Sequence, residues 1–89
     1  MKTSRQLERH FKGVANYSRL EILLLISKQK EISLENIAAI LNRNVKTISE
    51  HTRRLVAAGL VNKKYKGREV IHTTSPYGEK LITFIKTFN

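Results

Sequence analysis

Residues 34–61 read LENIAAILNRNVKTISEHTRRLVAAGLV, and this stretch predicts two short helices joined by a tight turn. The apolar positions of the first helix follow helical spacing: Leu34, Ile37, Ala38 and Leu41. Ser33 is an N-cap for this helix, and Asn44 is an N-cap for the next. Between them, Asn42 is the residue type that, after Gly, best tolerates a left-handed backbone. Two helices joined this tightly form a helix-turn-helix.

The second of these helices, predicted over 45–58, has two different faces. Ile48, Leu55 and, more weakly, Thr52 fall on one side. The opposite side carries four residues: Lys46, Glu50, Arg53 and Ala57. Two interpretations remain open: the second face contacts a partner, or it is a solvated helix surface with an excess of positive charge.

Charge is unevenly distributed along the chain. The 89 residues contain 17 Lys and Arg against 7 acidic residues, all Glu, giving a net charge of +10. Residues 43–68 carry +7 and residues 1–20 carry +4, whereas 21–42 and 69–89 sum to −1 and 0. Such a bias indicates a polyanionic partner bound at one face.

Composition also limits the classes of protein. The length predicts one domain, residues 1–89. The absence of Cys excludes disulfides, thiolate metal sites and cysteine nucleophiles. The sequence contains no apolar run long enough for a membrane span, and MKTSRQLERH lacks the apolar centre of a secretory signal, so we expect a cytoplasmic protein.

Three further start signals predict the remaining helices. Thr3 and Gln6 have capping-box spacing for a helix over 3–15, and Ser18 with Glu21 has the same spacing for a second helix. Ser75, followed by Pro76, predicts a last helix over 76–88.

The other segments predict extended structure. A short extended piece is expected at Ile32, and residues 60–74 predict a β-hairpin turning around Lys66 and Gly67. The predicted fold is mainly α with a small β-hairpin: helix, helix, short strand, helix-turn-helix, hairpin, helix.

The exposed face of the 45–58 helix carries the chemistry that reads duplex DNA in the major groove. Lys46 and Arg53 donate to guanine or phosphate, Ser49 donates or accepts, and Val45 contacts a thymine methyl group. Glu50 has two interpretations: it accepts from cytosine, or it holds the neighbouring cations in place. The flanking Thr47 and Arg54 complete the candidate set.

The hairpin is a candidate wing that grips the flanking backbone or the minor groove. Its cations are Lys63, Lys64, Lys66 and Arg68. Gly67 permits the positive φ of a tight turn. Alternatively, these cations protect an exposed edge strand from aggregation. Tyr65 either stacks on a sugar or packs across the hairpin. Backbone N–H groups near Ser33 and Asn44 are further candidate phosphate donors.

Enzymatic signals are lacking. We find no carboxylate pair, no Ser/His/Asp set, no Gly-rich phosphate loop and no metal-ligand spacing, and we predict no enzyme, no metal site and no cofactor.

Three segments together resemble winged-helix transcription regulators of the ArsR type, in the wider ArsR/MarR-like superfamily. They are FKGVANYSRLEIL (11–23), the helix-turn-helix (34–61) and the hairpin around KGREV, while TTSPYGEKL is similar to the MarR-like start of the last helix. The resemblance implies a dimeric, double-stranded DNA-binding repressor. It carries base contacts over to Val45, Lys46, Ser49, Glu50 and His51, and wing contacts to Lys66, Gly67 and Arg68.

The resemblance also implies that the terminal helices, 3–15 and 76–88, form a homodimer interface. The candidate residues are Leu7, Phe11, Leu81, Ile85 and Phe88. For the last helix, docking on its own core is an open alternative.

The chain departs from the family pattern at three places. Ser33 and Glu35 stand where metal-sensing members have cysteines, and the Asp/His ligand set of the last helix is missing, so the effector is undefined. Arg43 replaces an apolar residue of the turn, where its aliphatic stem can cover the core edge.

The alternative function is a non-specific architectural, RNA-binding or protein-docking winged helix.

Overall fold

The predicted helix-turn-helix is confirmed. A computed structural model describes residues 1–88, in which α3 (Leu34–Leu41) and α4 (Val45–Ala57) are separated by residues 42–44. Asn42 adopts the left-handed conformation, with φ +53° and ψ +54°. Ser33 Oγ accepts a hydrogen bond from Asn36 N, and Asn44 Oδ1 accepts from Lys46 N, so both predicted N-caps are in place.

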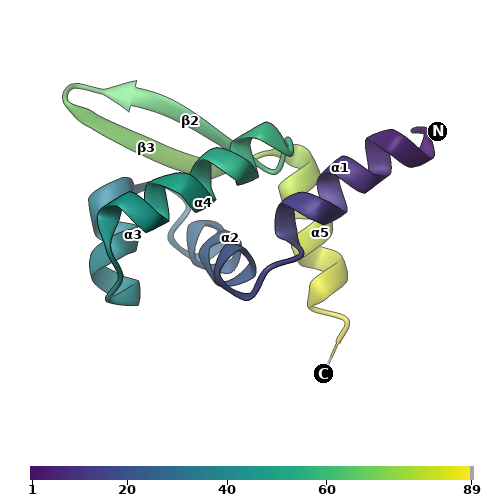
Figure 1. Cartoon of the computed structure of the whole chain (residues 1–89), viewed down its shortest axis with the longest axis horizontal. Helices are drawn as coiled ribbons and strands as arrows, with labels where there is room; N and C mark the ends of the chain where they lie inside the picture. The colour runs from purple at the N-terminus through teal and green to yellow at the C-terminus, as the bar shows by residue number, and fades with distance from the viewer. Residues whose placement is uncertain (89) are drawn as a thin grey trace.

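The predicted element order is also confirmed (Figure 1). The other elements within residues 1–88 are α1 (Ser4–Val14), α2 (Tyr17–Gln29), β1 (Ile32–Ser33), β2 (Val61–Lys66), β3 (Glu69–Thr74) and α5 (Pro76–Ile85). In Figure 1 the hairpin β2–β3 projects at the end of the molecule where α3 lies, while α1 and α5 lie at the other end. α4 packs on both α2 and α3.

The sheet is antiparallel with strand order β1-β3-β2. β1 pairs Ile32 with His72, and β2 pairs Lys66 with Glu69, which leaves Gly67 and Arg68 as the hairpin turn. Gly67 has φ +65°, a conformation that glycine adopts without steric cost.

The core lies beneath α4 and joins all the helices and the base of the sheet. Its completely buried aliphatic residues include Ile22, Leu23, Ile26, Ile37, Ile48 and Leu55. Ile48 and Leu55 are the apolar positions predicted for α4, so burial of this stripe fixes which face of the helix remains exposed.

The predicted Ser18–Glu21 capping box is wrong. Asn16 is the N-cap of α2, because its backbone is extended and its Oδ1 accepts from Arg19 N at 3.1 Å. Ser18 Oγ instead accepts from Arg43 Nη1 at 2.7 Å, and Arg43 Nη2 forms a 2.6 Å ion pair with Glu21 Oε1. Arg43 thus engages both residues of the predicted box and ties the helix-turn-helix to α2.

The last helix is shorter than predicted. α5 ends at Ile85, and residues 86–87 form a turn, so Phe88 lies beyond the helix. Thr87 Oγ1 donates to Phe84 O at 2.6 Å, a local side-chain bond that competes with continued helix. The first helix agrees closely with its prediction, including the Thr3–Gln6 capping box.

α1 packs on the end of α4 through a close backbone approach. A Cβ added to Gly13 would overlap the Cβ of Ala58, so only glycine fits at this crossing. Arg19 Nε donates to Gly13 O at 2.6 Å and holds the start of α2 against the end of α1. Across the described residues, 1–88, no helix has the length and apolarity required to cross a bilayer.

Candidate nucleic-acid interface

The exposed face of α4 is the surface that the sequence predicted. Lys46, Glu50, Arg53 and Ala57 lie on one exposed side of the helix, whereas Ile48, Thr52 and Leu55 are buried. At 100° per residue, Val45 and Ser49 fall on one flank, and Thr47 and Arg54 fall on the other. The chain does not cover Lys46 or Arg53.

Glu50 binds both arginines of this face. Arg53 Nη2 donates to Glu50 Oε1 at 2.5 Å and Nε donates to Oε2 at 3.3 Å, while Arg54 Nε lies 3.4 Å from Oε1. The hydrogen bonds from Arg53 lower the pKa of the Glu50 carboxyl. The interpretation that Glu50 holds neighbouring cations therefore matches the geometry.

His51 is set apart from the other predicted base contacts. It is half-buried on the side of α4 that faces α2, and its Nδ1 is buried without a hydrogen-bond partner. Burial, followed by the charges of Arg19, Arg43 and Arg54, lowers the pKa of its imidazole below the ordinary value of 6.5. At neutral pH the ring is uncharged.

A small cavity joins α4 to the wing. It has a volume of about 110 Å³, and its lining includes Ser49 and Arg53 from α4, Lys63 from β2 and His72 from β3. The structure therefore brings Ser49, Arg53 and Lys63, which are far apart in the sequence, to the same edge of the molecule.

The wing cations divide between two faces of the hairpin. Side chains alternate along a strand, so Lys63 and Tyr65 share the face toward α4, whereas Lys64 and Lys66 point from the opposite face. Glu31 binds this second pair, with distances of 3.2 Å to Lys64 Nζ and 3.3 Å to Lys66 Nζ. These two hydrogen bonds lower the pKa of Glu31.

The tip of the wing is open to solvent. Gly67 and Arg68 are exposed, and a Cβ added at Gly67 would meet no neighbouring atom. Tyr65 is 73% exposed, so the hairpin leaves most of its ring in solvent.

The helix N-termini offer fewer donors than predicted. Asn44 Oδ1 already accepts from the amides of Lys46 and Thr47, and Ser33 Oγ accepts from that of Asn36. These backbone N–H groups, which the sequence predicted as candidate phosphate donors, therefore already donate to the capping side chains.

Three of the five candidate dimer residues of the terminal helices line one apolar cavity. Leu7 and Phe11 of α1 and Leu81 of α5 line a volume of about 320 Å³. Ile85 is half-buried, and Phe88 is exposed, with its ring centroid 5.1 Å from that of Phe84.

Sequence reasoning missed other residues of this cavity. His10, Leu60, Tyr77, Lys80 and Phe84 also line it. Phe84 follows Leu81 at helical spacing, which was a usable signal, whereas only the fold brings Leu60 to this surface.

No three His, Asp or Glu side chains within residues 1–88 are grouped closely enough to hold a metal ion. Ser33, one of the two positions compared above with the cysteines of the ArsR-type pattern, is buried and caps α3.

A family model matches most of the chain. Residues 14–80 match the model of the family described as HVO_A0114. The chain belongs to the HVO_A0114 family. No curated protein matches it.

Solved structures of transcriptional regulators share this fold, and they confirm the resemblance of the chain to ArsR-type winged helices. The homodimeric winged helix-turn-helix DNA-binding domain of Mb0332 from Mycobacterium bovis, a possible ArsR-family transcriptional regulator, has a TM-score of 0.85 and 26% identity, with 98% of this chain and 86% of that chain covered. Reduced HlyU from Vibrio cholerae has a TM-score of 0.80 and 27% identity, with 92% and 85% covered.

A third structure is similar in fold alone. The transcriptional repressor PagR of Bacillus anthracis has a TM-score of 0.82 at 22% identity, with 91% of this chain and 93% of that chain covered.

Proposed function

We propose that the chain is a double-stranded DNA-binding transcriptional regulator, a single-domain binding protein and not an enzyme, that acts as a homodimeric repressor. The observation that carries the proposal is the exposure of Lys46 and Arg53 on the face of α4 opposite Ile48 and Leu55. Because Ile48 and Leu55 are buried, the opposite face of α4 must point to solvent. The similarity to a DNA-binding domain and to transcriptional regulators supports the same function.

The recognition helix enters the major groove. Lys46 and Arg53 donate to base edges or phosphates, Ser49 donates or accepts, and Val45 meets a thymine methyl group. Glu50 aligns Arg53 and Arg54 for this contact. Thr47 and His51, on the flank toward α2, contact the strand at the edge of the groove.

The wing contacts the flanking backbone or the minor groove. Lys63 lies on the face of the hairpin toward α4, and Gly67 and Arg68 form the projecting tip. These three residues are therefore the wing residues that contact the DNA without losing an ion pair among residues 1–88. Lys64 and Lys66 reach phosphate by exchanging Glu31 for it. Both ion pairs are well exposed, and exposed ion pairs contribute little to stability, so replacing Glu31 by phosphate costs little free energy.

The dimer forms through α1 and α5. Leu7, Phe11 and Leu81 line a shared apolar hollow. We expect Ile85, one helical turn after Leu81, and Phe88, whose ring packs against that of Phe84, to take part in the same interface. A second copy related by a two-fold axis would fill the hollow with the same residues. The homodimeric state of the Mb0332 domain supports this arrangement.

Selection of bound duplexes from a random pool tests the function. We expect an enriched site with two-fold symmetry, because two α4 helices related by a dyad would read two half-sites. Binding that enriches no sequence would instead indicate a non-specific architectural module. Failure to retain any duplex at low salt would contradict the proposal.

A further inference from the structure

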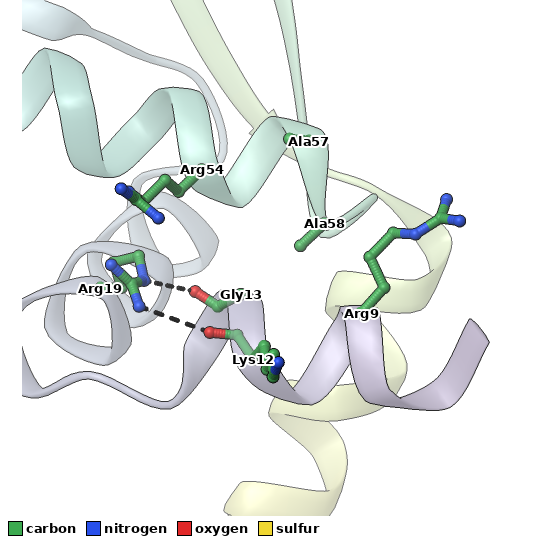
Figure 2. Close-up of a pocket in the computed structure, with 7 residues that line it drawn as sticks. All are labelled: Arg9, Lys12, Gly13, Arg19, Arg54, Ala57 and Ala58. Carbon is green, nitrogen blue, oxygen red and sulfur yellow. Dashed lines mark hydrogen bonds between the residues drawn. The ribbon is translucent and has the colours of Figure 1, made fainter. Parts of the chain in front are cut away.

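A second basic surface lies beyond the C-terminal end of α4. An open hollow of about 230 Å³ lies between α1, α2 and α4, and Gly13, Ala57 and Ala58 form what we call its floor. Four cationic side chains line it: Arg9, Lys12, Arg19 and Arg54. Figure 2 shows Arg19 and Arg54 on one side of the hollow and Arg9 on the other.

The floor of the pocket is built by close backbone packing. Because Gly13 has no Cβ, α1 approaches Ala58 directly, and no large side chain fills the space between the two helices. The floor of the hollow therefore follows from the packing of α1 against the end of α4.

The carbonyl groups near this floor are already paired. Arg19 donates from Nε to Gly13 O at 2.6 Å and from Nη2 to Lys12 O at 3.4 Å, and Figure 2 shows both bonds. His10 Nδ1 lies 2.6 Å from Ala58 O, and it donates, because a carbonyl only accepts. These hydrogen bonds partly neutralise the negative ends of α1 and α4 and so reduce their repulsion of an anion.

The lining has no acidic residue to balance its four cations. Two carboxylates lie outside it: Glu8 is 3.5 Å from Lys12 Nζ, and Glu50 is 3.4 Å from Arg54 Nε. Both pairs are exposed and weak. Two positive charges remain in excess, so the electrostatic potential of the hollow favours an anion.

We propose that this pocket binds a phosphate group, and that the group is a backbone phosphate of the duplex bound by α4. Guanidinium groups such as that of Arg54 present a planar fork of donors that matches phosphate oxygens. Ala57 lies both on the pocket floor and on the exposed face of α4, so the pocket adjoins the proposed DNA surface. The DNA source rests on the proposed function.

The pocket gives the recognition helix a backbone contact on each side. The wing contacts the duplex on the side of α4 that carries Ser49. The pocket contacts it on the other side of α4, near the C-terminal end of the helix and Arg54. Phosphate contacts fix register without reading sequence, so the pocket contributes affinity that is equal for all duplexes.

The first experiment asks whether the pocket binds phosphate at all. Inorganic phosphate is titrated into the full chain at constant ionic strength while the amide resonances of Gly13, Ala57 and Ala58 are followed. We expect the resonances to shift and saturate as phosphate is added. In Arg9→Gln/Lys12→Gln, we expect the affinity for phosphate to fall about tenfold or more. These two side chains are exposed on α1, and Gln is a good helix former, so the variant folds. The control, Lys28→Gln/Lys86→Gln, removes the same charge elsewhere and leaves the titration unchanged.

The second experiment asks whether the phosphate comes from DNA. Duplex affinity is measured against salt concentration, and the Arg9→Gln/Lys12→Gln variant is expected to flatten the slope of log K against log salt by about 1 to 2. The control variant flattens it less. Both selected and random duplexes are expected to weaken by the same factor.

The outcomes separate the two proposals. Pocket shifts with an unchanged duplex slope would assign the site to a free phosphate compound and overturn the DNA source. If the unmodified chain binds no duplex, the proposed function fails, while the phosphate titration still decides the chemistry of the pocket. Absence of saturable shifts at Gly13, Ala57 and Ala58 overturns the phosphate site.

Discussion

Arg53 donates two hydrogen bonds to Glu50 across one turn of α4, the shorter one 2.5 Å from Nη2 to Oε1. The same carboxylate lies 3.4 Å from Arg54 Nε. One acidic side chain therefore aligns two guanidinium groups at the centre of the proposed DNA surface and reduces their net charge.

Replacement of Glu50 separates its two interpretations. In Glu50→Gln, we expect random-duplex affinity to rise and the slope of log K against log salt to steepen by up to about 1, because both arginines become free for phosphate. Glu79→Gln on α5 makes the same charge change away from α4 and is the control. A loss of affinity restricted to the selected site would show instead that Glu50 accepts from a base.

Where α1 crosses the end of α4, there is room for a Cβ at Ala58 or at Gly13 but not at both. Gly13→Ala is expected to destabilise the fold by about 1–3 kcal/mol, the usual cost of overpacking, because its methyl group overlaps that of Ala58. Thermal unfolding should shift down by about 4–8 °C for each kcal/mol.

The double variant Gly13→Ala/Ala58→Gly is the matched control for this crossing. With the Ala58 methyl removed, the nearest remaining atoms are its Cα at 3.6 Å and Leu60 Cδ1 at 3.7 Å, both ordinary contacts. Most of the lost stability should return. A double variant no more stable than Gly13→Ala would refute the steric explanation.

His72 makes stability depend on pH. The side chain is 2% exposed, and its Nδ1 has no hydrogen-bond partner. Burial first, and then the charge of Lys63, lowers the pKa of the imidazole, against a backbone hydrogen bond with Ile32 that raises it. Below pH 6.5 the imidazole of His72 is protonated in the unfolded chain but still neutral in the folded chain. The free energy of unfolding is therefore at its full value above pH 6.5 and decreases as the pH falls toward the lowered pKa of the folded state.

Thermal unfolding between pH 7.5 and 5 measures this dependence. Each unit of pKa lowering corresponds to about 1.4 kcal/mol lost below both pKa values. His72→Gln should remove more of the pH dependence than His51→Gln, because His51 is only half-buried. Equal effects of the two substitutions would argue against a special role of His72.

Phe84 provides the sharpest test of the dimer surface. Phe84 and Ile40 are each 53% exposed, so a glutamate at either position leaves the monomer core intact. If α1 and α5 form a two-fold interface, Phe84→Glu loses apolar burial twice, about 3–6 kcal/mol, and the dimer Kd rises about 100-fold or more. Ile40→Glu should leave it unchanged. Sedimentation velocity over a concentration series distinguishes the two.

Local signals account for what the sequence predicted well. Ser33, Asn42, Asn44 and Ser75 act within three or four residues, so their roles as caps or turn residues follow from spacing alone. The Glu50–Arg53 pair is also a helical neighbour contact. Ser18 was misjudged because a distant residue, Arg43, competes for its hydroxyl.

Contacts between distant segments could not be predicted. Glu31 meets Lys64 and Lys66 only because β1 joins the sheet beside β3. The basic pocket likewise unites Arg9 with Arg54 through the packing of α1 on α4, and no sequence spacing links them. Charge counting placed positive charge in residues 1–20 and 43–68 and indicated one binding face, but it could not show that Arg9 and Arg54 line the same pocket.

Duplex binding by Lys46→Glu/Arg53→Glu tests the central claim, that the exposed face of α4 binds DNA. For the unmodified chain we predict a steep salt dependence, with about 10³ to 10⁵-fold weaker binding at 200 mM than at 50 mM salt if 6–10 phosphates are contacted. The charge-reversed variant should lose most of this affinity, whereas Lys28→Glu/Lys86→Glu, with the same net charge, should keep it. Equal losses in the two variants, or no binding by the unmodified chain at low salt, would contradict the claim.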